Sequence, residues 1–474
     1  MADNRPNILL LFSDQHRSDV LGCAGHEVVQ TPNLDRLAHE GVRFPESWCQ
    51  SPVCQPSRAS VITGRYTHQL GLFGNTGPLN PEWPTVMKAL QGAGYETATI
   101  GKTHYRGTPA REEVEEVEAA GRTFDMRSFE PFVKSFGWDY VLEEFDRYVH
   151  TSRRLRSPYL DHLESHGVAQ EYRDMIKSVF RLTPEHWRAK TSVLPQELDL
   201  TSFLADEAIR WLKERSNTKP FFLKLGFVQP HVPLIDDPVW AERYRDADIA
   251  LPNQVPIEAP NPVWGRHLEN LNRHSQVQMM DDEFIRNGIR HYLGMVSLID
   301  QRIGDIVASL EASGELENTW IIYSADHGEM LGEHRLWAKM NFYRGSVQVP
   351  LIIRPPGGRE GRIDSGLTEL TDVTATIADI AGVALPTCMG QSLLSRVAAD
   401  SGSGREYVFS RYNSYAALRG KRYRLTVELE SGTPCELFDL EDDPGETRNL
   451  VGDPSSAGVI EELRNSVLAE HLQR

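Results

Sequence analysis

The chain has 474 residues, of which 40% are hydrophobic and 25% charged, and its formal net charge is −17. This charge disfavours nucleic acid as a partner, because binding to phosphate backbones depends on accumulated Lys and Arg. It is compatible with a small anionic substrate held in a locally positive pocket. Because no apolar stretch approaches the length of a membrane span, we also predict no association with a membrane.

The first hundred residues alternate between strand and helix patterns. Asn7–Ser13 is a continuous apolar run that ends in polar residues, which is typical of a strand buried on both faces. Helices are predicted over Asn33–Glu40 and Trp83–Ala93, and a second buried strand over Glu96–Ile100. Since no hairpin signal separates these elements, the pattern predicts an α/β domain with a mostly parallel sheet.

The pattern degrades between residues 105 and 198. This segment is rich in Arg, Glu, Tyr and Phe and lacks a sustained hydrophobic period. It is either a disordered insertion or a folded excursion, and its aromatic residues favour a lid that faces the substrate.

Regular alternation resumes at residue 199. Helical periodicity extends over Asp199–Arg215, Asp282–Leu316 and Leu370–Gly382. Buried-strand patterns lie at Pro220–Val228, Thr319–Ser324 and Val349–Ile353. Together with the N-terminal elements they predict one large domain over residues 1–395, with helices on both faces of its sheet.

The C-terminal pattern differs, because strands follow one another without helices between them. Short strands are predicted at Tyr407–Ser410, Tyr415–Arg419, Tyr423–Val427 and Glu436–Leu440, and a closing helix at Val459–Gln473. Such a succession predicts a small antiparallel sheet. We therefore place a second, α+β subdomain at residues 396–474.

The five cysteines are an odd number, with no CxxC pair and no zinc-site spacing. The apolar run at Asn7–Ser13 lacks the length and the small-residue cleavage site of a secretory signal. We expect reduced thiols in a cytoplasmic protein.

Four of the predicted buried strands end in polar residues. These are Asp14 with Gln15, Lys102 with His104, His231, and Asp326 with His327. Each alone is more often a helix cap or a surface residue, but ligands of an open parallel sheet bind outside the carboxyl ends of its strands, so the four should converge. Two carboxylates, an amide oxygen and an imidazole would suit Ca²⁺, Mg²⁺ or Mn²⁺.

Cys54 is a further candidate. It precedes Pro56, which is favoured in the first turn of a helix, and Arg58 follows one turn later. Cys54 would then face the positive end of that helix, where backbone N–H groups favour an anion. A lone cysteine in such a place is more often a buried packing residue, and it is the neighbouring polar clusters that favour the functional interpretation.

The stretch Cys54-Gln55-Pro56-Ser57-Arg58, followed by Thr63-Gly64-Arg65, resembles the signature of the formylglycine-dependent sulfatases of the alkaline phosphatase superfamily. The stretches 326–339 and 439–450 resemble the family as well, and only residues 105–198 do so weakly. The resemblance implies an alkaline-phosphatase-like fold with a catalytic domain at 1–395. It also implies a formylglycine-generating enzyme that oxidises Cys54 to an aldehyde, whose hydrate is the nucleophile.

The resemblance implies that one divalent cation, usually Ca²⁺, is bound at this site. Its ligands would be Asp14, Gln15, Asp326, His327 and the modified Cys54. Many family members have Asp and Asn where this chain has Gln15 and His327. Because imidazole suits transition metals, Mn²⁺ is a stronger alternative here than it would otherwise be, and Mg²⁺ is a further one.

The resemblance further implies roles in the hydrolysis of a sulfate ester. A hydroxyl on residue 54 would attack the sulfur, with Arg58 on the hydroxyl groups and both Lys102 and Lys339 on the sulfate oxygens. His231 would protonate the departing alcohol, and His104 would take a proton from residue 54 to expel sulfate. The residues themselves support only the positions of the two histidines.

Two other functions stay open. A phosphonate monoester or phosphodiester hydrolase would share the fold, the metal and the formylglycine. A non-catalytic, metal-stabilised binding protein would keep Cys54 as a thiol, which the surrounding lysines and histidines disfavour. The Lys102–His104 and His231 stretches look more like those of sulfatases, so we favour a small anionic sulfate ester as the substrate. The sequence does not identify the alcohol, and it is compatible with a homo-oligomer.

Overall fold

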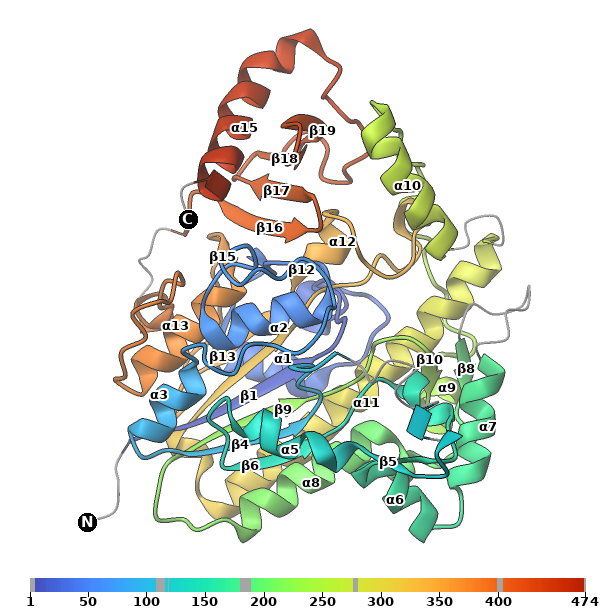
Figure 1. Ribbon diagram of the computed structural model, residues 1–474, viewed down its shortest axis with the longest axis vertical. Helices are drawn as coiled ribbons and strands as arrows, with labels where there is room; N and C mark the ends of the chain where they lie inside the picture. The colour runs from blue at the N-terminus through green and yellow to red at the C-terminus, as the bar shows by residue number, and fades with distance from the viewer. Residues whose placement is uncertain are drawn as a thin grey trace.

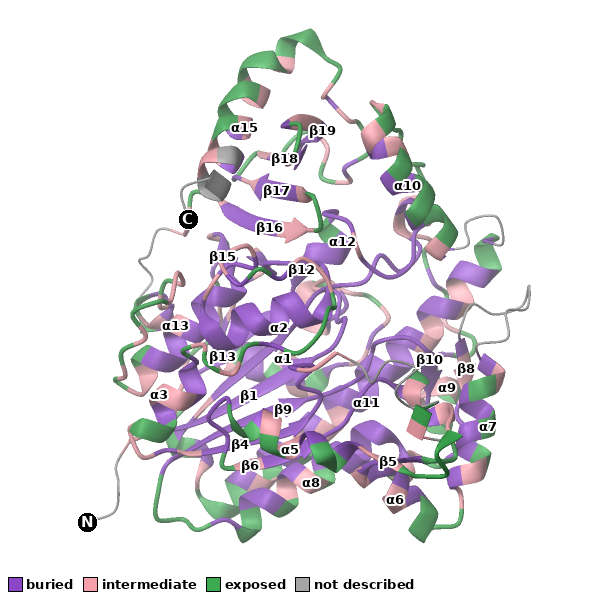
Figure 2. Cartoon of the chain, in the orientation of Figure 1, coloured by how far each residue is buried: buried purple, intermediate pink, exposed green. Residues whose placement is uncertain are grey.

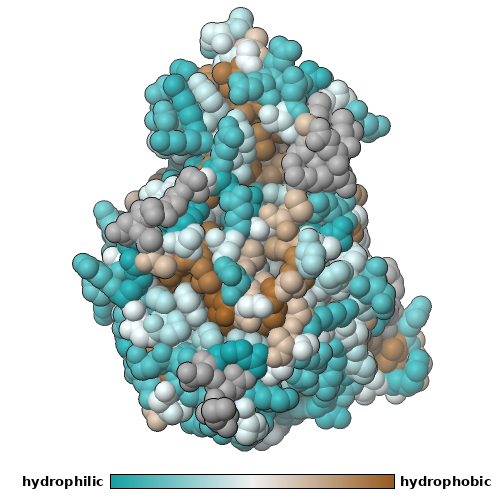
Figure 3. Space-filling model, turned by 90° about the vertical axis from the view of Figure 1, so that its left-hand side faces the viewer, coloured by the Kyte–Doolittle hydropathy of each residue, from teal (hydrophilic) through white to brown (hydrophobic). Residues whose placement is uncertain are grey.

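The computed structural model describes residues 5–107, 116–117, 119–179, 189–275, 280–398 and 404–472. A large body contains most of the chain, and a smaller lobe made of the C-terminal strands and helix lies above it in Figure 1. The face seen in Figure 3 is mostly hydrophilic, with hydrophobic residues showing in the region between lobe and body.

An eight-stranded sheet runs through the body in the order β14-β2-β13-β11-β1-β9-β4-β6. Its strands are β1 (Asn7–Ser13), β2 (Val42–Arg43), β4 (Glu96–Gly101), β6 (Tyr140–Glu143), β9 (Phe221–Gly226), β11 (Thr319–Ala325), β13 (Leu351–Arg354) and β14 (Arg362–Ile363). The strands from β11 to β6 in this order pair in parallel, whereas β13 is antiparallel to β11. The predicted mostly parallel sheet is confirmed.

Helices cover both faces of this sheet, because its central strands are apolar on both sides. Leu9 and Leu11 of β1 pack into one hydrophobic cluster, and Ile8 and Leu10 into another. The first cluster includes residues of α1 (Pro32–His39), α8 (Leu200–Glu214) and α11 (Asp282–Ser313), and the second includes residues of α2 (Cys54–Thr63), α3 (Val86–Gly92) and α13 (Leu370–Ile380). Every residue of β1 is buried, as the purple strands of Figure 2 show.

The lobe is a four-stranded antiparallel sheet with a long helix. Its elements are β16 (Val408–Tyr412), β17 (Tyr415–Arg419), β18 (Tyr423–Glu428), β19 (Thr433–Asp439) and α15 (Ala457–Leu472). The predicted C-terminal sheet and closing helix are therefore confirmed. A buried hydrogen bond from the Tyr343 hydroxyl to Glu436 Oε1, 2.5 Å long, joins the body to the lobe.

The described part of segment 105–198 is largely regular. It contains β5 (Phe124–Asp125), α5 (Glu130–Lys134), β6, β7 (Leu155–Arg156), α6 (Pro158–Ser165), α7 (Ala169–Val179) and β8 (Ala189–Thr191). β6 extends the main sheet by pairing with β4, and Leu160 and Ile176 join the hydrophobic cluster of Leu9. These elements thus pack as part of the core, and the role of a lid stays a prediction.

Further strands and α-helices complete the described part of the fold. They are β3 (Ser47–Trp48), β10 (Leu234–Asp236), β12 (Gln348–Val349), β15 (Thr368–Glu369), α9 (Pro238–Tyr244), α10 (Pro262–Ser275), α12 (Arg344–Val347) and α14 (Leu394–Ala398). All five cysteines are free. Among the described helices, none combines the length and the apolar character that crossing a membrane requires.

Two predicted boundaries differ from the structure for local reasons. The helix predicted from Trp83 begins at Val86, because Thr85 caps it and its hydroxyl accepts the Lys88 N–H at 3.2 Å. The strand predicted over Val349–Ile353 is divided between β12 and β13 at Pro350, which has no N–H to donate to a neighbouring strand.

Candidate active site

The four polar clusters predicted at strand ends come together in the structure. β11, β1, β9 and β4 are neighbours in the sheet and run in the same direction, so the residues after them leave the sheet at one edge. Asp326 Oδ1 accepts the backbone N–H of the residue after Asp14 at 3.0 Å. Lys102 Nζ lies 2.5 Å from Asp14 Oδ2 and 2.5 Å from Asp146 Oδ1. The same Asp146 oxygen lies 3.6 Å from His231 Nδ1.

Cys54 reaches the same edge from the first turn of α2. Val53 is extended, with φ −146°, and the helix begins at Cys54, whose side chain is only 1% exposed. The Ser57 hydroxyl donates to the carbonyl of Asp326 at 2.6 Å, which holds the start of the helix against the end of β11. The N-terminus of α2 therefore faces the polar cluster.

Four side chains offer donor atoms for a metal ion. One atom each from Asp14, Cys54, Asp326 and His327 lies within 4.8 Å of the others. Cys54 Sγ is 3.2 Å from His327 Nε2 and 3.8 Å from Asp14 Oδ1. His327 Nδ1 lies 2.9 Å from the carbonyl of Gly328; a proton on Nδ1 satisfies that contact and leaves the Nε2 lone pair facing the cluster. Two carboxylates and an imidazole fit a divalent cation, and Sγ stands where the oxygens of a formylglycine hydrate would lie.

Arg58 holds the carboxylates of this cluster in place. Its Nε donates to Asp326 Oδ2 at 2.8 Å and a terminal nitrogen to Asp14 Oδ2 at 3.2 Å. The other terminal nitrogen donates to the carbonyl of Lys102 at 2.7 Å. Burial lowers the pKa of Arg58, but the two aspartates outweigh it and hold this pKa above its ordinary value. A contact between Arg58 and hydroxyl groups on residue 54 stays a prediction.

Positive charge surrounds Cys54. Lys339 Nζ lies 3.3 Å from Cys54 Sγ. Burial raises the pKa of the Cys54 thiol, but Lys339, Lys102 and His327 outweigh burial and hold this pKa well below its ordinary value. Burial lowers the pKa of Lys102, whereas Asp14 and Asp146 raise it, and the net result is well above the ordinary value. The site therefore favours a negative charge at residue 54.

The Gln15 amide lies in the site with a fixed orientation. Its Oε1 accepts a hydrogen bond from Lys339 Nζ at 2.6 Å, and its Nε2 donates to Glu329. Glu329 also accepts the backbone N–H groups of Leu331, at 3.0 Å, and of Ala338. Glu329, part of the 326–339 stretch, thus orients the Gln15 oxygen toward Lys339. Metal ligation by Gln15 stays a prediction.

The two predicted catalytic histidines approach from β4 and β9. The His104 side chain contributes to lowering the pKa of the Cys54 thiol, and the His104 backbone is in the left-handed region at φ 59°. His231 Nδ1 lies 2.7 Å from the Val232 carbonyl, in addition to its contact with Asp146. Both side chains are buried. Their catalytic roles stay predictions.

Sequence reasoning missed two acidic residues of the site. Asp146 links Lys102 to His231, and Glu143 accepts the backbone N–H groups of Thr103 at 3.0 Å and of the next residue at 3.4 Å. Both lie at or just after the end of β6. A signal was present, because the short Tyr-Val-Leu run ends in acidic residues as the other strands end in polar ones.

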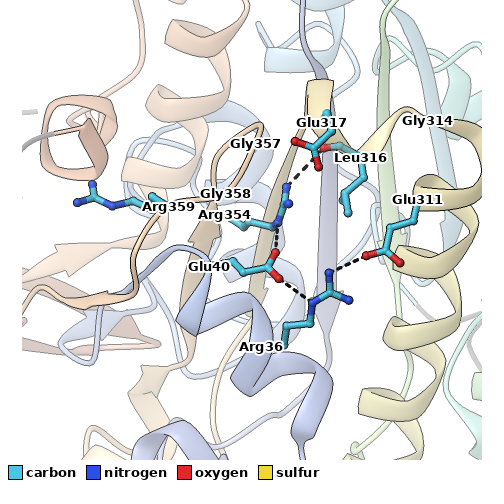
Figure 4. Close-up of a pocket in the computed structure, with 10 residues that line it drawn as sticks. All are labelled: Arg36, Glu40, Glu311, Gly314, Leu316, Glu317, Arg354, Gly357, Gly358 and Arg359. Atoms are coloured by element: carbon cyan, nitrogen blue, oxygen red, sulfur yellow. Dashed lines mark hydrogen bonds and ion pairs between the residues drawn. The ribbon is translucent and has the colours of Figure 1, made fainter.

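A cavity of about 480 Å³ lies away from this site, next to the start of β11 (Figure 4). Arg36 donates to Glu40 and Glu311, and Arg354 donates to Glu40. Its ten lining residues include neither cysteine nor histidine. The Cys54 site therefore remains the candidate for catalysis.

The fold and site define an α/β enzyme. It places Cys54 at the N-terminus of α2, beside side chains that can bind a divalent metal ion. A family model described as Sulfatase matches residues 6–383, and a model described as N-sulphoglucosamine sulphohydrolase, C-terminal, matches residues 332–473. Since the first match covers most of the chain, this protein belongs to the sulfatase family and is an enzyme of that family.

Relatives and solved structures agree over nearly the full length. The chain is 28% identical to an arylsulfatase of Clostridium perfringens, over 98% of this chain and 94% of the relative. It is 30% identical to a choline-sulfatase of Rhizobium meliloti, over 96% of this chain and 84% of the relative. The structure of a phosphonate monoester hydrolase from Silicibacter pomeroyi superposes with a TM-score of 0.78 at 26% identity, covering 99% of this chain and 96% of that one.

Proposed function

We propose that this protein hydrolyses sulfate esters, with residue 54 as the nucleophile after Cys54 has been converted to formylglycine. The position of Cys54 carries the proposal: it lies at the N-terminus of α2, 3.3 Å from Lys339 and 3.2 Å from His327. Such surroundings stabilise negative charge on the nucleophile and on the group that it attacks. The relatives named arylsulfatase and choline-sulfatase support a sulfate ester as the substrate.

The modified residue would come from a formylglycine-generating enzyme. A divalent cation would be held by Asp14, Gln15, Asp326 and His327, with Ca²⁺ expected first and Mn²⁺ or Mg²⁺ as alternatives. When bound, the cation would polarise the sulfate and lower the pKa of a hydroxyl on residue 54.

The remaining steps belong to side chains of this chain. Lys102 and Lys339 would bind the nonbridging oxygens, where negative charge develops. His104, which contributes to the lowered pKa of Cys54, would take a proton from residue 54 so that sulfate can leave. His231 would protonate the departing alcohol from Nε2, because its Nδ1 faces the Val232 carbonyl.

Hydrolysis of a phosphonate monoester is the second candidate. The similarity to a solved phosphonate monoester hydrolase favours it. Sulfate monoesters, phosphonate monoesters and phosphodiesters each carry one negative charge at neutral pH, so the charge of the pocket does not discriminate among them. A phosphate monoester, with nearly two negative charges, is expected to be a poor substrate.

The deciding experiment compares kcat/KM for matched aryl esters of sulfate, phenylphosphonate and a phosphodiester on one preparation. Peptide mass spectrometry first verifies formylglycine at position 54, and Cys54→Ala, purified in parallel, controls for contaminating hydrolases. We expect the sulfate ester to lead. A lead of about a hundredfold for the phosphonate or the diester, ~2.7 kcal/mol in transition-state free energy, would replace our first choice by the second.

A further inference from the structure

The turn that follows β4 carries two residues of the site, Lys102 and His104, and its backbone is constrained at both ends. Gly101 has φ 88° and His104 has φ 59°. A side chain at 101 would meet the Gly226 carbonyl at 2.1 Å, so the two strands approach closely there. The left-handed conformation costs a residue such as His104 about 1 kcal/mol or more. Contacts elsewhere must hold this turn in place.

Glu143 holds the turn from the side of β6. Its Oε1 accepts the N–H groups of Thr103 at 3.0 Å and of His104 at 3.4 Å. Glu143 is 5% exposed. Glu143 therefore fixes the backbone directly at His104, the proposed catalytic base.

Lys224 holds the same turn from the opposite side. β4 lies between β9 and β6, with Lys224 opposite Thr99 and Glu143 opposite Gly101. Lys224 Nζ donates to the Lys102 carbonyl at 3.1 Å, an oxygen that Arg58 also binds. Lys224 thus holds the main chain of the residue whose ammonium group reaches Asp14.

The two charges are buried together and have no part in the steps described above. Burial raises the pKa of Glu143 to about 7, and burial with the nearby Arg58 lowers that of Lys224 to about 7, while each charge favours the ionised form of the other. Burying ionisable groups is costly unless they are paired and hydrogen-bonded. Neither side chain is among the four that offer metal donors.

We infer that Glu143 and Lys224 are positioning residues that clamp the turn after β4 from both sides, and so keep His104 and Lys102 in place beside residue 54. The inference rests on the proposed function, because that function gives the two clamped residues their roles. The hydrogen-bonding oxygen of Glu143 is the essential feature, rather than its charge.

The test uses full-length protein in two forms. In unconverted Cys54 protein, hydrogen exchange followed by mass spectrometry reports on the 96–107 segment without any catalysis. In protein with verified formylglycine, kcat and KM for an aryl sulfate report on the site. The variants are Glu143→Met, which removes the acceptor, and Glu143→Gln, which keeps Oε1. Glu144→Met is the matched control, because this adjacent buried carboxylate accepts the Tyr159 N–H instead.

We expect Glu143→Met to speed exchange in segment 96–107 and to lower kcat about tenfold or more with little change in KM, since misplacing a catalytic group costs rate. Glu143→Gln should restore slow exchange and keep kcat within about threefold of the parent protein. Glu144→Met should leave exchange in that segment unchanged. If Glu143→Met does not fold, Lys224→Met is measured in the same way and should also speed exchange there.

Two results would overturn the inference. One is hydrogen exchange in segment 96–107 that stays at the parent rate in Glu143→Met. The other is a Glu143→Gln variant as defective as Glu143→Met, which would make the charge the essential feature. Failure of the proposed function looks different: the parent protein would hydrolyse none of the sulfate esters, while the exchange measurement would still test the clamp.

Discussion

The centre and the edge of the main sheet contribute to the site in different ways. From the centre, β1 and β11 deliver Asp14 and His327 to within 3.8 Å and 3.2 Å of Cys54 Sγ. At the edge, β6 leads to Glu143 and Asp146, whose described contacts are with other residues of the site. The centre thus supplies the groups that face the reaction, and the edge supplies the groups that hold them. Substitutions should therefore lose activity in a graded order from centre to edge.

The largest effect is expected for Cys54→Ala. Removal of a nucleophile costs about 10⁴-fold or more in kcat, and little of the core is lost with one sulfur atom. Activity on an aryl sulfate and the circular dichroism spectrum are measured together. The matched control is Cys49→Ala, another fully buried cysteine, which should remain active. An active Cys54→Ala protein with a native spectrum would contradict the proposed mechanism.

Asp326→Ala comes next, because it removes a donor from the centre of the sheet. We expect it to lower metal content and kcat/KM together, the latter by more than about a hundredfold, since loss of residues that merely support metal ligands already costs 10–100-fold. Elemental analysis of the purified variant provides the metal content. Asp300→Ala is the control, because this buried carboxylate caps α1 instead and accepts the Leu34 N–H at 2.7 Å. An inactive Asp326→Ala with a full metal complement would place the metal elsewhere.

Asp146→Asn tests the edge, with an expected loss of about tenfold in kcat/KM, comparable to other supporting residues. Burial raises the pKa of Asp146, but Lys102 and His231 outweigh it and hold this pKa well below its ordinary value. A depressed pKa stabilises the folded protein above the ordinary pKa of Asp, about 4, and this contribution is lost as the pH falls through the folded-state value.

The difference in unfolding free energy between parent and Asp146→Asn should therefore be larger at pH 7 than in acid. Urea unfolding at several pH values measures it. The control is Asp139→Asn, at an exposed carboxylate that accepts the Thr97 N–H at 3.0 Å. A difference that grows as the pH falls would show that Asp146 is not held as the charged partner of Lys102.

The contrast between the centre and the edge of the main sheet also explains how much of the site could be predicted from the sequence. β1, β4, β9 and β11 are largely buried strands of six or seven residues, long enough to be distinguished from loops, and polar residues follow each of them. β6 has only four residues and lies among short helices, so the acidic residues at and after its end are a weaker signal than the polar residues after the longer strands.

Other features depend on contacts that no local pattern contains. Arg58 reaches Asp326 across 268 residues of sequence. The orientation of the Gln15 amide is set by Glu329, 314 residues later. Residue types and strand ends were therefore predictable, whereas the partners that orient each side chain were determined only by tertiary packing.

The smallest effect on activity is expected for Leu142→Ala, which tests whether the edge belongs to the core. Leu142 of β6 is 8% exposed and packs in the same hydrophobic cluster as Leu9. Truncation of a buried leucine destabilises a folded protein by about 2–5 kcal/mol. Because Leu142 has no place in the site, kcat should stay within about twofold of the parent value.

The measurement is urea unfolding, followed by both tryptophan fluorescence and circular dichroism. If β6 is part of the core, the two probes should give one shared transition that moves to lower urea concentration. Val239→Ala, at a position 60% exposed on α9, is the control and should shift the midpoint little, since exposed substitutions usually change stability by less than about 0.5 kcal/mol. A lid that unfolds by itself would instead give an early, separate transition in Leu142→Ala and leave the main one unmoved. The edge of the sheet would then be an independent unit, and the positions of Glu143 and Asp146 would not depend on the stability of the centre.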